Sequence, residues 1–548
     1  IHWLSNFQSM IKFKFIRSIS FISFFISSVC FSSIHVKGVE EPSHIAESAR
    51  ASNRGFGYPK LSDVSFSSRR FRPENQKDPH DTFSTLLRFF STRLDWVYDY
   101  GNQENIIGRT NALGLNYNGA ISSILPDEIG GFVRIRGRDR SVNGDLSVLA
   151  HLPSKPAIGD VWSEQYMKIA SNHLREMIRL GADGIQVDDP GMNYAEAVYR
   201  EGGYGDASNE KFSLWLKQNS SKKQRRNWSI DLDIDEFSYR EWVHSKGGKD
   251  LIPPDLKELH EKFLLEGLLQ FYETLRKVAA EANGGVQVPF SCNTSSNVVW
   301  KDYSKWADFG MAETRMNNIS PMKIWRWVCS PERKIGKGHV LCPPRYDALT
   351  PPANIVPFTR SCIATTYAMG SLMIVPWDVW QKNKGGPRYF GTAEEYADIY
   401  GFVRATPELF DGYEAVFCRG GGIPTSIYKF NKSPVVLQGN HDVVVAVVRC
   451  IPKSESAPVV IHLVDWKKPQ SFTLILDQTQ FFFGNKMAFN LFTPTAYDQN
   501  LHEKIYAESK FNQLALVKEL TPERHPDGKL RLLIPPLNPW GIIKVSLK

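Results

Sequence analysis

The sequence predicts an α/β fold, a (β/α)8 TIM barrel at residues 91–410, followed by a C-terminal all-β sandwich at 411–548. In the first region, short apolar stretches of strand length alternate with stretches of helical periodicity, which is typical of parallel βα units. In the second region, strand-length stretches continue but helical periods become scarce, which is typical of antiparallel sheets. The 548 residues, 42% of them hydrophobic, are enough for a large core and two or three domains.

The first region contains eight strand candidates, a number that favours a closed barrel over an open sheet. A helix is predicted between the third and fourth candidates, at 164–180, where apolar residues recur at helical spacing. A longer helix is predicted at 255–282, and Asn283-Gly284 would end it. The eight strand candidates are residues 94–100, 113–121, 146–152, 184–189, 286–293, 309–314, 339–345 and 372–378.

The second region contains strand-like segments separated by turns or polar stretches. Three consecutive glycines at 420–422 mark a candidate boundary with the barrel. The predicted strands of the sandwich are residues 443–449, 459–466, 472–477, 488–492, 530–534 and 542–547.

The N-terminal residues 1–38 resemble a secretory signal peptide with some upstream residues. Met10 is a candidate start, basic residues follow it, and 19–31 form a short apolar stretch interrupted by serines. This stretch is too short for a transmembrane helix, so we expect export, either secreted or periplasmic, and no stable membrane insertion. Residues 39–90 are polar and rich in Ser and Arg, which suggests a linker and a peripheral segment.

Composition and motifs argue against several classes of partner and cofactor. The net charge is +8, but the basic residues are dispersed, and the densest run, 222–226, has no nucleic-acid motif beside it. We therefore interpret that run as a solvated loop and expect no nucleic-acid partner. No P-loop, dinucleotide fingerprint or catalytic-serine elbow is present, so we expect no cofactor. The cysteines outside the signal show no metal-ligand spacing, and the sequence does not pair them: Cys292, Cys329, Cys342, Cys362, Cys418 and Cys450.

An acidic pair ends the fourth strand candidate. The run Gly-Ala-Asp-Gly-Ile-Gln-Val-Asp-Asp at 181–189 is apolar until Asp188 and Asp189, and Pro and Gly then interrupt it. Side chains alternate along a strand, so Gln186 and Asp188 share one face, and the apolar residues between them suit packing against outer helices. We therefore expect Asp188 to face the barrel axis and Asp189 to orient it or to bind substrate.

Polar residues stand near the ends of other strand candidates, and strand ends form the active face of a TIM barrel. Glu313 ends a short apolar strand that carries small residues, which leave room for a cleft. Trp377 precedes Asp378, and aromatic rings beside carboxylates suit a sugar site because flat rings stack on pyranose faces. The candidate substrate-binding residues are Asp189, Asn293, Asp378, Trp377, His151, Arg345 and Asn116.

Two carboxyl groups on either side of a bond are the minimum for glycoside hydrolysis. Asp188 as nucleophile or base and Glu313 as general acid fit these roles, although the sequence gives no distance between them. One alternative is a barrel that binds glycans without cleaving them. Another is a polysaccharide lyase or an esterase. A lyase usually has a base near an arginine that binds the uronate, and His151 with Arg345 matches that pattern only weakly.

The run at 181–189 is similar to fourth-strand motifs of the α-amylase and α-galactosidase groups of TIM-barrel glycoside hydrolases, in which an Asp at the strand end is the nucleophile. The segments Phe-Ser-Leu-Trp-Leu at 212–216 and Phe-Ser-Tyr-Arg-Glu-Trp at 237–242 resemble barrels of the family 42 β-galactosidase type. That family has an Asn-Glu pair on strand four, where this chain has Asp188-Asp189. The resemblance implies a barrel glycosidase with Asp188 as a catalytic carboxylate.

Overall fold

A computed structural model gives the fold of those residues between 57 and 547 that it describes. They lie within one compact unit that spans residues 41–548. The predicted signal segment lies outside the described residues. The described residues are 57–67, 82–97, 103–125, 137–149, 156–230, 237–293, 306–315, 319–329, 339–345, 355–376, 392–423, 433–439, 443–454, 456–467, 469–481 and 487–547.

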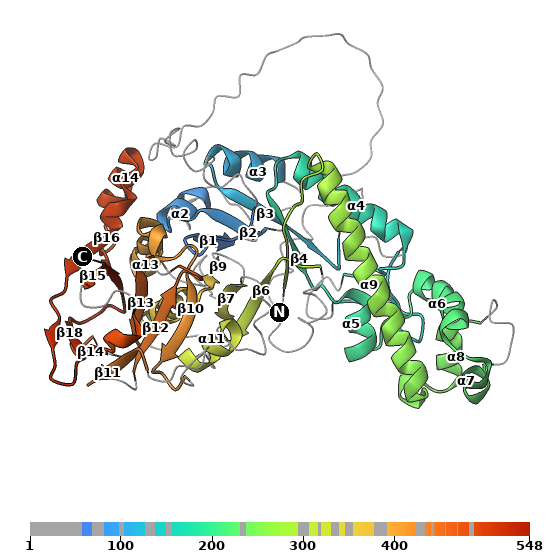
Figure 1. The fold of residues 1–548 in the computed structure, drawn as a ribbon. Coiled ribbons are helices and arrows are strands. Elements are labelled where there is room, and N and C mark those ends of the chain that lie inside the picture. Colours follow the sequence, from blue (N-terminus) through green and yellow to red (C-terminus); the bar gives the residue numbers. More distant parts are fainter. Residues whose placement is uncertain are drawn as a thin grey trace, which may run out of the picture. The chain divides into compact units, whose positions relative to one another are not determined.

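The barrel sheet is a closed ring of parallel strands (Figure 1). Its last strand consists of two short pieces, of which β8 pairs with β7 and β9 pairs with β1, so the ring closes through residues 372–376. The predicted (β/α)8 barrel is thereby confirmed. The strands are β1 (Ser65–Ser67), β2 (Arg93–Val97), β3 (Asn116–Ser122), β4 (Gly184–Asp188), β5 (Phe290–Asn293), β6 (Phe309–Arg315), β7 (His339–Arg345), β8 (Leu372–Met373) and β9 (Val375–Pro376).

Two errors in the predicted strand list compensate for each other. The candidate at 146–152 is wrong as a barrel strand, because Leu146 and Val148 form only isolated antiparallel bridges in the connection between β3 and the next helix. The true first strand, β1, lies in the stretch 39–90 that we interpreted as peripheral. Its three residues, Ser-Phe-Ser, are too few for their alternation to stand out in the sequence. The strand that ends at Asp188 is therefore still the fourth.

Helices pack around the outside of the barrel. The best example is α4 (Glu164–Arg179), which begins where the Ser163 hydroxyl accepts a hydrogen bond from the Tyr166 amide at 3.3 Å. Its buried face includes Tyr166, Leu174 and Met177, and burying each such side chain contributes roughly 1.5–3 kcal/mol. The other helices of the barrel are α2 (Thr82–Arg88), α3 (Gln103–Ala112), α9 (Pro254–Ala282), α11 (Pro321–Val328), α12 (Ile355–Met369) and α13 (Ala393–Ala405).

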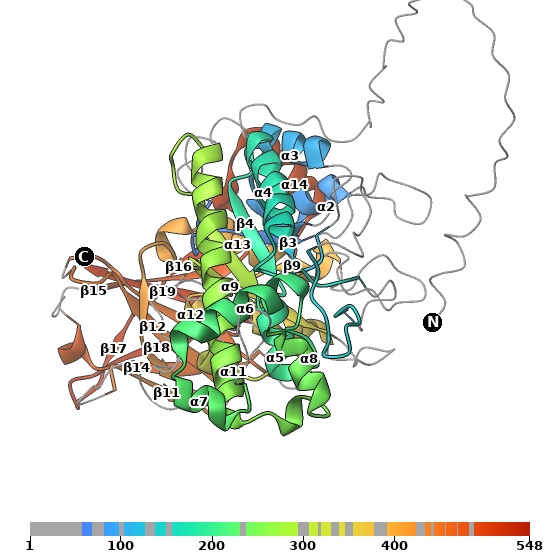
Figure 2. The same cartoon turned by 90° about the vertical axis from the view of Figure 1, so that its right-hand side faces the viewer.

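A helical insertion separates β4 from α9, which lies beside α4 (Figure 2). Aromatic side chains pack it against α9, where Phe212 and Tyr239 contact the buried His260 and Phe212 also contacts Phe263. The basic run 222–226 forms part of α7, a short helix with no buried residues, so it is solvated as expected but helical rather than a loop. The insertion consists of α5 (Met192–Tyr199), α6 (Asp206–Asn219), α7 (Lys222–Asn227), α8 (Tyr239–Ser245) and the turn η1 (Lys249–Leu251).

The C-terminal region is an antiparallel sandwich, as predicted. A six-stranded sheet in the order β10-β12-β13-β19-β15-β16 faces a four-stranded sheet in the order β11-β14-β18-β17. Apolar residues from both sheets form the core between them. The six predicted strands correspond to β12 (Val444–Cys450), β13 (Val459–Asp465), β14 (Phe472–Leu476), β15 (Met487–Pro494), β18 (Leu530–Ile534) and β19 (Trp540–Leu547). The sequence missed β10 (Glu414–Arg419), β11 (Val435–Gln438), β16 (Ala515–Glu519), β17 (Glu523–Arg524) and the helix α14 (Gln499–Glu508).

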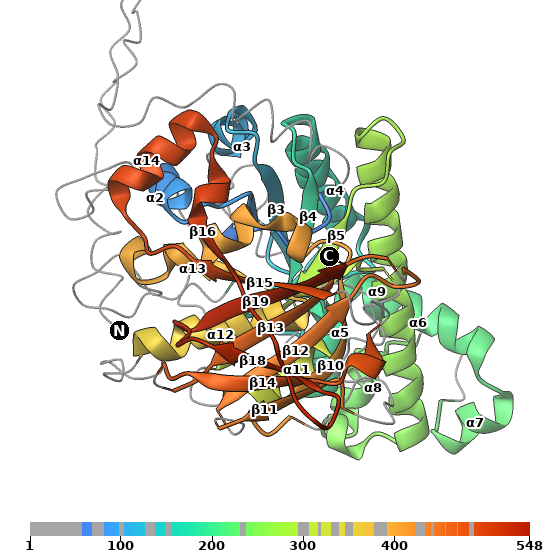
Figure 3. The same cartoon turned by 60° about the vertical axis from the view of Figure 1, so that its left-hand side comes forward.

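Polar contacts fasten the six-stranded sheet to α12, with which it lies side by side (Figure 3). The Ser361 hydroxyl donates to the Asp465 carbonyl at 3.0 Å, and the Trp466 indole donates to the Thr365 hydroxyl at 2.9 Å. Arg360 donates to the Asn538 carbonyl at 3.1 Å while it pairs with Asp398. Among the helices in the described part of the chain, none combines the length and apolarity needed to cross a membrane.

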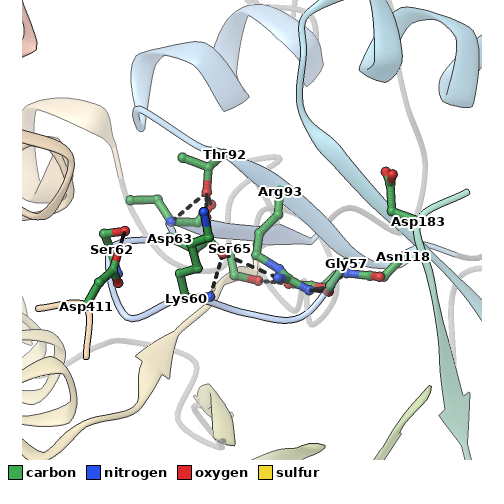
Figure 4. Close-up of polar contacts among 12 residues, drawn as sticks. Gly57, Lys60, Ser62, Asp63, Ser65, Thr92, Arg93, Asn118, Asp183 and Asp411 are labelled. Carbon is green, nitrogen blue, oxygen red and sulfur yellow. Dashed lines mark hydrogen bonds and ion pairs between the residues drawn. The ribbon is translucent and has the colours of Figure 1, made fainter. Parts of the chain in front are cut away.

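The lower part of the barrel interior holds a buried ionic network (Figure 4). The Arg93 guanidinium donates to Asp95 at 2.8 and 3.0 Å and lies 3.4 Å from Asp63. Asp95 also accepts hydrogen bonds from Ser65 of β1 and from Asn118 of β3. A bulge follows in β2, where Trp96 has a φ of 63°. The network joins three neighbouring strands beneath the face where the strands end.

Candidate active site

The structure places Asp188 on the inner face of the barrel, at the C-terminal end of β4. A Cβ added to Gly119 of β3 would run into Met177 of α4, so side chains in that phase of the sheet face the outer helices. Gly119 pairs with Ile185, which leaves Gln186 and Asp188 in the opposite phase. This is the orientation that alternation along the sequence predicted.

Two hydrogen-bond donors fix one oxygen of the Asp188 carboxylate. The Asn293 amide nitrogen donates to Oδ1 at 2.7 Å from the end of the adjacent strand β5. The backbone N–H of Asp189 donates to the same oxygen at 3.0 Å. Both donors hold the carboxyl group at the face of the barrel where the strands end. The Asn293 Oδ1 atom is buried and has no hydrogen-bond partner among the described residues.

The acidic loop after β4 has an unusual backbone. Asp189 and Met192 have positive φ values, 48° and 41°, which non-glycine residues adopt rarely and at a cost of about 1–3 kcal/mol each. The loop is held from outside by Tyr272 of α9, whose hydroxyl donates to the Pro190 carbonyl at 2.9 Å. The Tyr272 ring in turn stacks on Trp306, with 3.8 Å between ring centroids.

Asp189 lies in an environment that favours its neutral form. Burial first, and then the charge of Asp188, raise the pKa of the Asp189 carboxyl to about 7. Arg200 opposes this shift, and Glu196 adds to it. Arg200 itself bonds Glu196 at 2.6 Å, so part of its charge is already compensated.

The second predicted catalytic residue lies on a strand of the same sheet. Val187 pairs with Cys292, and Cys292 pairs with Gly310, so Met311 of β6 is level with Asp188. Glu313 follows two residues further towards the C-terminal end of β6. Its backbone is described, but its side chain lies outside the described residues. The same holds for Arg345, the last residue of β7.

Of the remaining predicted residues, three lie outside the described residues and one lies at the wrong end of the barrel. His151, Trp377 and Asp378 lie outside the described residues. Asn116 is the first residue of β3, so it lies at the opposite end of the barrel from the strand ends, and its place in the predicted site is wrong. The predicted strand began and ended too early. Ser122, which pairs with Asp188, occupies the corresponding place at the active face.

The sequence also missed a pair of buried acids that shape the loops beside the site. Asp160 accepts hydrogen bonds from the Ser208 amide and hydroxyl at 2.9 and 2.6 Å, and from the Asn193 side chain at 3.1 Å. Asp139 accepts bonds from the amide of Gly203 and from that of a second glycine nearby. Burial and the charge of Asp160 raise the pKa of Asp139 to about 8. Through Asn193, near the start of α5, this network ties the loop after β3 to the loop that follows Asp189.

In the described part of the chain, no three His, Cys, Asp or Glu side chains lie close enough together to hold a metal ion. Groups that bond the Asp188 carboxylate include the Asn293 side-chain amide and the Asp189 backbone N–H.

Comparisons with known proteins bear on the fold. No protein-family model matches the chain, and no curated protein sequence matches it. Among solved structures, the chain is similar to a cycloisomaltooligosaccharide glucanotransferase of a Paenibacillus species, complexed with cycloisomaltoheptaose. The TM-score is 0.52 and the identity 10%, over 88% of this chain and 85% of that one.

Two further structures are more distant. An α-L-fucosidase isoenzyme of Paenibacillus thiaminolyticus has a TM-score of 0.49 at 8% identity, over 89% of this chain and 100% of that one. A maltogenic α-amylase of Thermotoga neapolitana has a TM-score of 0.46 at 8% identity, over 89% and 99%. The likeness to the glucanotransferase is one of fold alone, at 10% identity. The particular family within that fold is not assigned.

Proposed function

We propose that the protein is an exported glycoside hydrolase that cleaves a glycosidic bond in an oligo- or polysaccharide with two carboxyl groups. The observation that carries the proposal is Asp188, which faces the barrel axis at the end of β4 with one oxygen fixed by Asn293 and by the Asp189 amide. The shared fold with a glucanotransferase bound to a cyclic oligosaccharide supports a carbohydrate substrate.

In the proposed reaction, Glu313 protonates the glycosidic oxygen as the bond to the leaving group breaks. Asp188 either attacks the anomeric carbon or takes a proton from a water molecule that does so. The role of Glu313 is supported by the alternation along β6. The Phe309 ring lies 5.7 Å from the Arg93 guanidinium inside the barrel, and residue 313 is in the same phase of the strand.

The remaining predicted residues would bind and orient the sugar. Asn293 positions the Asp188 carboxylate and so acts chiefly through it. Asp189 supports Asp188 through its backbone N–H, and its carboxyl group is placed to donate a hydrogen bond when protonated. The stacking and hydrogen-bonding roles fall to Trp377, Asp378, His151 and Arg345.

The test is turnover on a panel of glycans, measured as release of new reducing ends by the purified protein. We expect Asp188→Asn and Glu313→Gln to lose at least about a thousandfold in kcat, since each removes a reacting group. The matched control is Asp183→Asn. Asp183 precedes the same strand at its lower end, where its carboxylate accepts a bond from the Tyr117 amide at 2.9 Å. Turnover like that of the wild type in both catalytic variants would refute the assignment.

The alternatives give different outcomes in the same experiment. Glycan binding by the wild-type protein without turnover on any substrate would indicate a non-catalytic glycan-binding barrel. Unsaturated products that absorb in the ultraviolet would indicate a polysaccharide lyase. Release of acyl groups without new reducing ends would indicate an esterase.

Export is proposed from the basic and apolar pattern of residues 1–38. It predicts a mature N-terminus near residue 38 in protein recovered from the medium or the periplasm. An uncleaved chain recovered from the cytosol would contradict it.

A further inference from the structure

A row of four aromatic rings connects α4, α9 and the segment before β6. Tyr166 of α4 stacks on Phe271 of α9, with 5.6 Å between the ring centroids. Phe271 contacts Tyr272 edge to face at 5.4 Å, and Tyr272 stacks on Trp306 at 3.8 Å. All four rings are buried in the barrel cluster. Close packing on both sides leaves these rings little room to turn, so each tyrosine hydroxyl is held in a fixed place.

The two tyrosine hydroxyls in this row bond backbone carbonyls on either side of Asp188. The Tyr166 hydroxyl donates to the Ser122 carbonyl at 3.0 Å, and Ser122 is the residue of β3 that pairs with Asp188. The Tyr272 hydroxyl donates to the Pro190 carbonyl at 2.9 Å, two residues beyond Asp188. A buried phenol hydroxyl usually has such a partner. The outer helices α4 and α9 thus fix the backbone on both sides of the candidate catalytic carboxylate.

The loop that Tyr272 contacts has a backbone that needs such a hold. Asp189 and Met192 have φ values of 48° and 41°, a conformation that persists only where the surrounding structure enforces it. The Met192 N–H donates to the Asp189 carbonyl at 3.2 Å, and the Asp189 N–H donates to the Asp188 carboxylate at 3.0 Å. Pro190 lies between the two strained residues and has no N–H, so its carbonyl is the backbone group through which the loop can be held.

We propose that Tyr272 is a positioning residue for the hydrolysis, an inference that rests on the function proposed for Asp188. Its hydroxyl holds the Pro190 carbonyl, and the loop conformation that results directs the Asp189 N–H at the Asp188 carboxylate. Misplacing a reacting group by about 1 Å can cost on the order of a hundredfold in rate. Loss of the hydroxyl should therefore lower kcat. Because Tyr272 acts on Asp188 through the loop, the KM should change little.

The test variant is Tyr272→Phe, which removes the hydroxyl and keeps a ring to stack on Trp306. The matched control is Tyr506→Phe. Tyr506 of α14 is also buried, and its hydroxyl donates to the Leu87 carbonyl at 3.1 Å. Leu87 lies near the end of α2, which leads to the start of β2, at the opposite end of the barrel from the acidic loop. Each variant loses one buried bond from a hydroxyl to a carbonyl, and thermal unfolding measures the general loss of stability in both.

Two measurements on the full chain separate positioning from stability. Hydrogen exchange of peptides that cover residues 186–195 reports on the loop and needs no substrate. We expect exchange there to be about 2- to 10-fold faster in Tyr272→Phe, the effect of losing one net hydrogen bond. On any glycan that the wild type cleaves, we expect kcat to fall by about 10- to 100-fold with little change in KM. Tyr506→Phe should match the wild type in both measurements.

The outcomes are distinct. Unchanged exchange of residues 186–195 in Tyr272→Phe would overturn the proposal, as would faster exchange with the kcat of the wild type. A fall in kcat that Tyr506→Phe shares would also overturn it, because the cause would then be a general loss of stability. Absence of turnover by the wild-type protein would instead contradict the proposed hydrolysis, and the exchange rates would still decide whether Tyr272 holds the loop.

Discussion

Replacing Arg93 with methionine removes a cation from the interior of the barrel and leaves the shape of the side chain roughly intact. In the wild type, Arg93 is fully buried and pairs with Asp95 at 2.8 Å and with Asp63 at 3.4 Å. Asp63 and Asp95 are themselves 3% and 0% exposed. The variant therefore leaves two buried carboxylates without this counter-ion, a change that typically costs about 3–5 kcal/mol. That is a large share of the roughly 5–15 kcal/mol by which domains are stable.

The matched control is Arg179→Met on the surface of α4. Arg179 bonds Glu176 at 2.7 Å, but its side chain is 68% exposed, so water screens the pair and it adds little to stability. Urea unfolding followed by tryptophan fluorescence at pH 7 measures both variants against the wild type. We expect a clearly lower midpoint for Arg93→Met and a nearly unchanged one for Arg179→Met. Equal midpoints for the two variants at pH 7 would refute the argument.

Three further changes test the packing and the buried titrating groups. In thermal unfolding, Gly184→Ala should destabilise the protein by about 1–3 kcal/mol, because a Cβ there would overlap Asn118 inside the barrel. Gly108→Ala has open space around it and should stabilise α3 by roughly 0.5–1 kcal/mol. Burial lowers the pKa of His260 to about 3, so between about pH 6.5 and 3 the unfolded chain binds a proton that the folded protein does not, and acid destabilises the fold. In urea titrations, His260→Phe should therefore lose less free energy of unfolding than the wild type as the pH falls through that range, and an equal loss would contradict this. The pKa of Asp189 is raised to about 7, so the wild type should lose stability as the pH rises from 4 to 7, and Asp189→Asn should lose less, by ~2 kcal/mol, over the same interval.

The sequence predicted the barrel where its strands follow the usual pattern. Strands such as β4 carry an apolar residue towards the helices at every second position, and the periodicity reveals this directly. β1 has three residues, and its two serines face a polar interior, where Ser65 bonds Asp95. Nothing in that short segment distinguishes a buried strand from a polar linker. The false candidate at 146–152 shows the reverse, since apolar residues in a long loop imitate a strand.

The candidate site was predictable in part for related reasons. Asp188 and Asn293 stand out because each polar residue ends an apolar strand, and the structure brings them to 2.7 Å from each other. The hydrogen bond from Tyr272 to the Pro190 carbonyl joins a helix to a loop 82 residues away in the sequence. No local sequence pattern reveals such a contact. The positive φ of Asp189 is likewise a product of the assembled barrel.

The central claim is that Asp188 and Glu313 face each other across the end of the barrel. The distance between their carboxyl carbons in a crystal structure tests it most directly. We predict about 5–10 Å across an open cleft, with about 5–5.5 Å indicating retention and a longer distance indicating inversion of the anomeric centre. A separation well above 10 Å, or a Glu313 side chain directed away from the cleft, would contradict the claim.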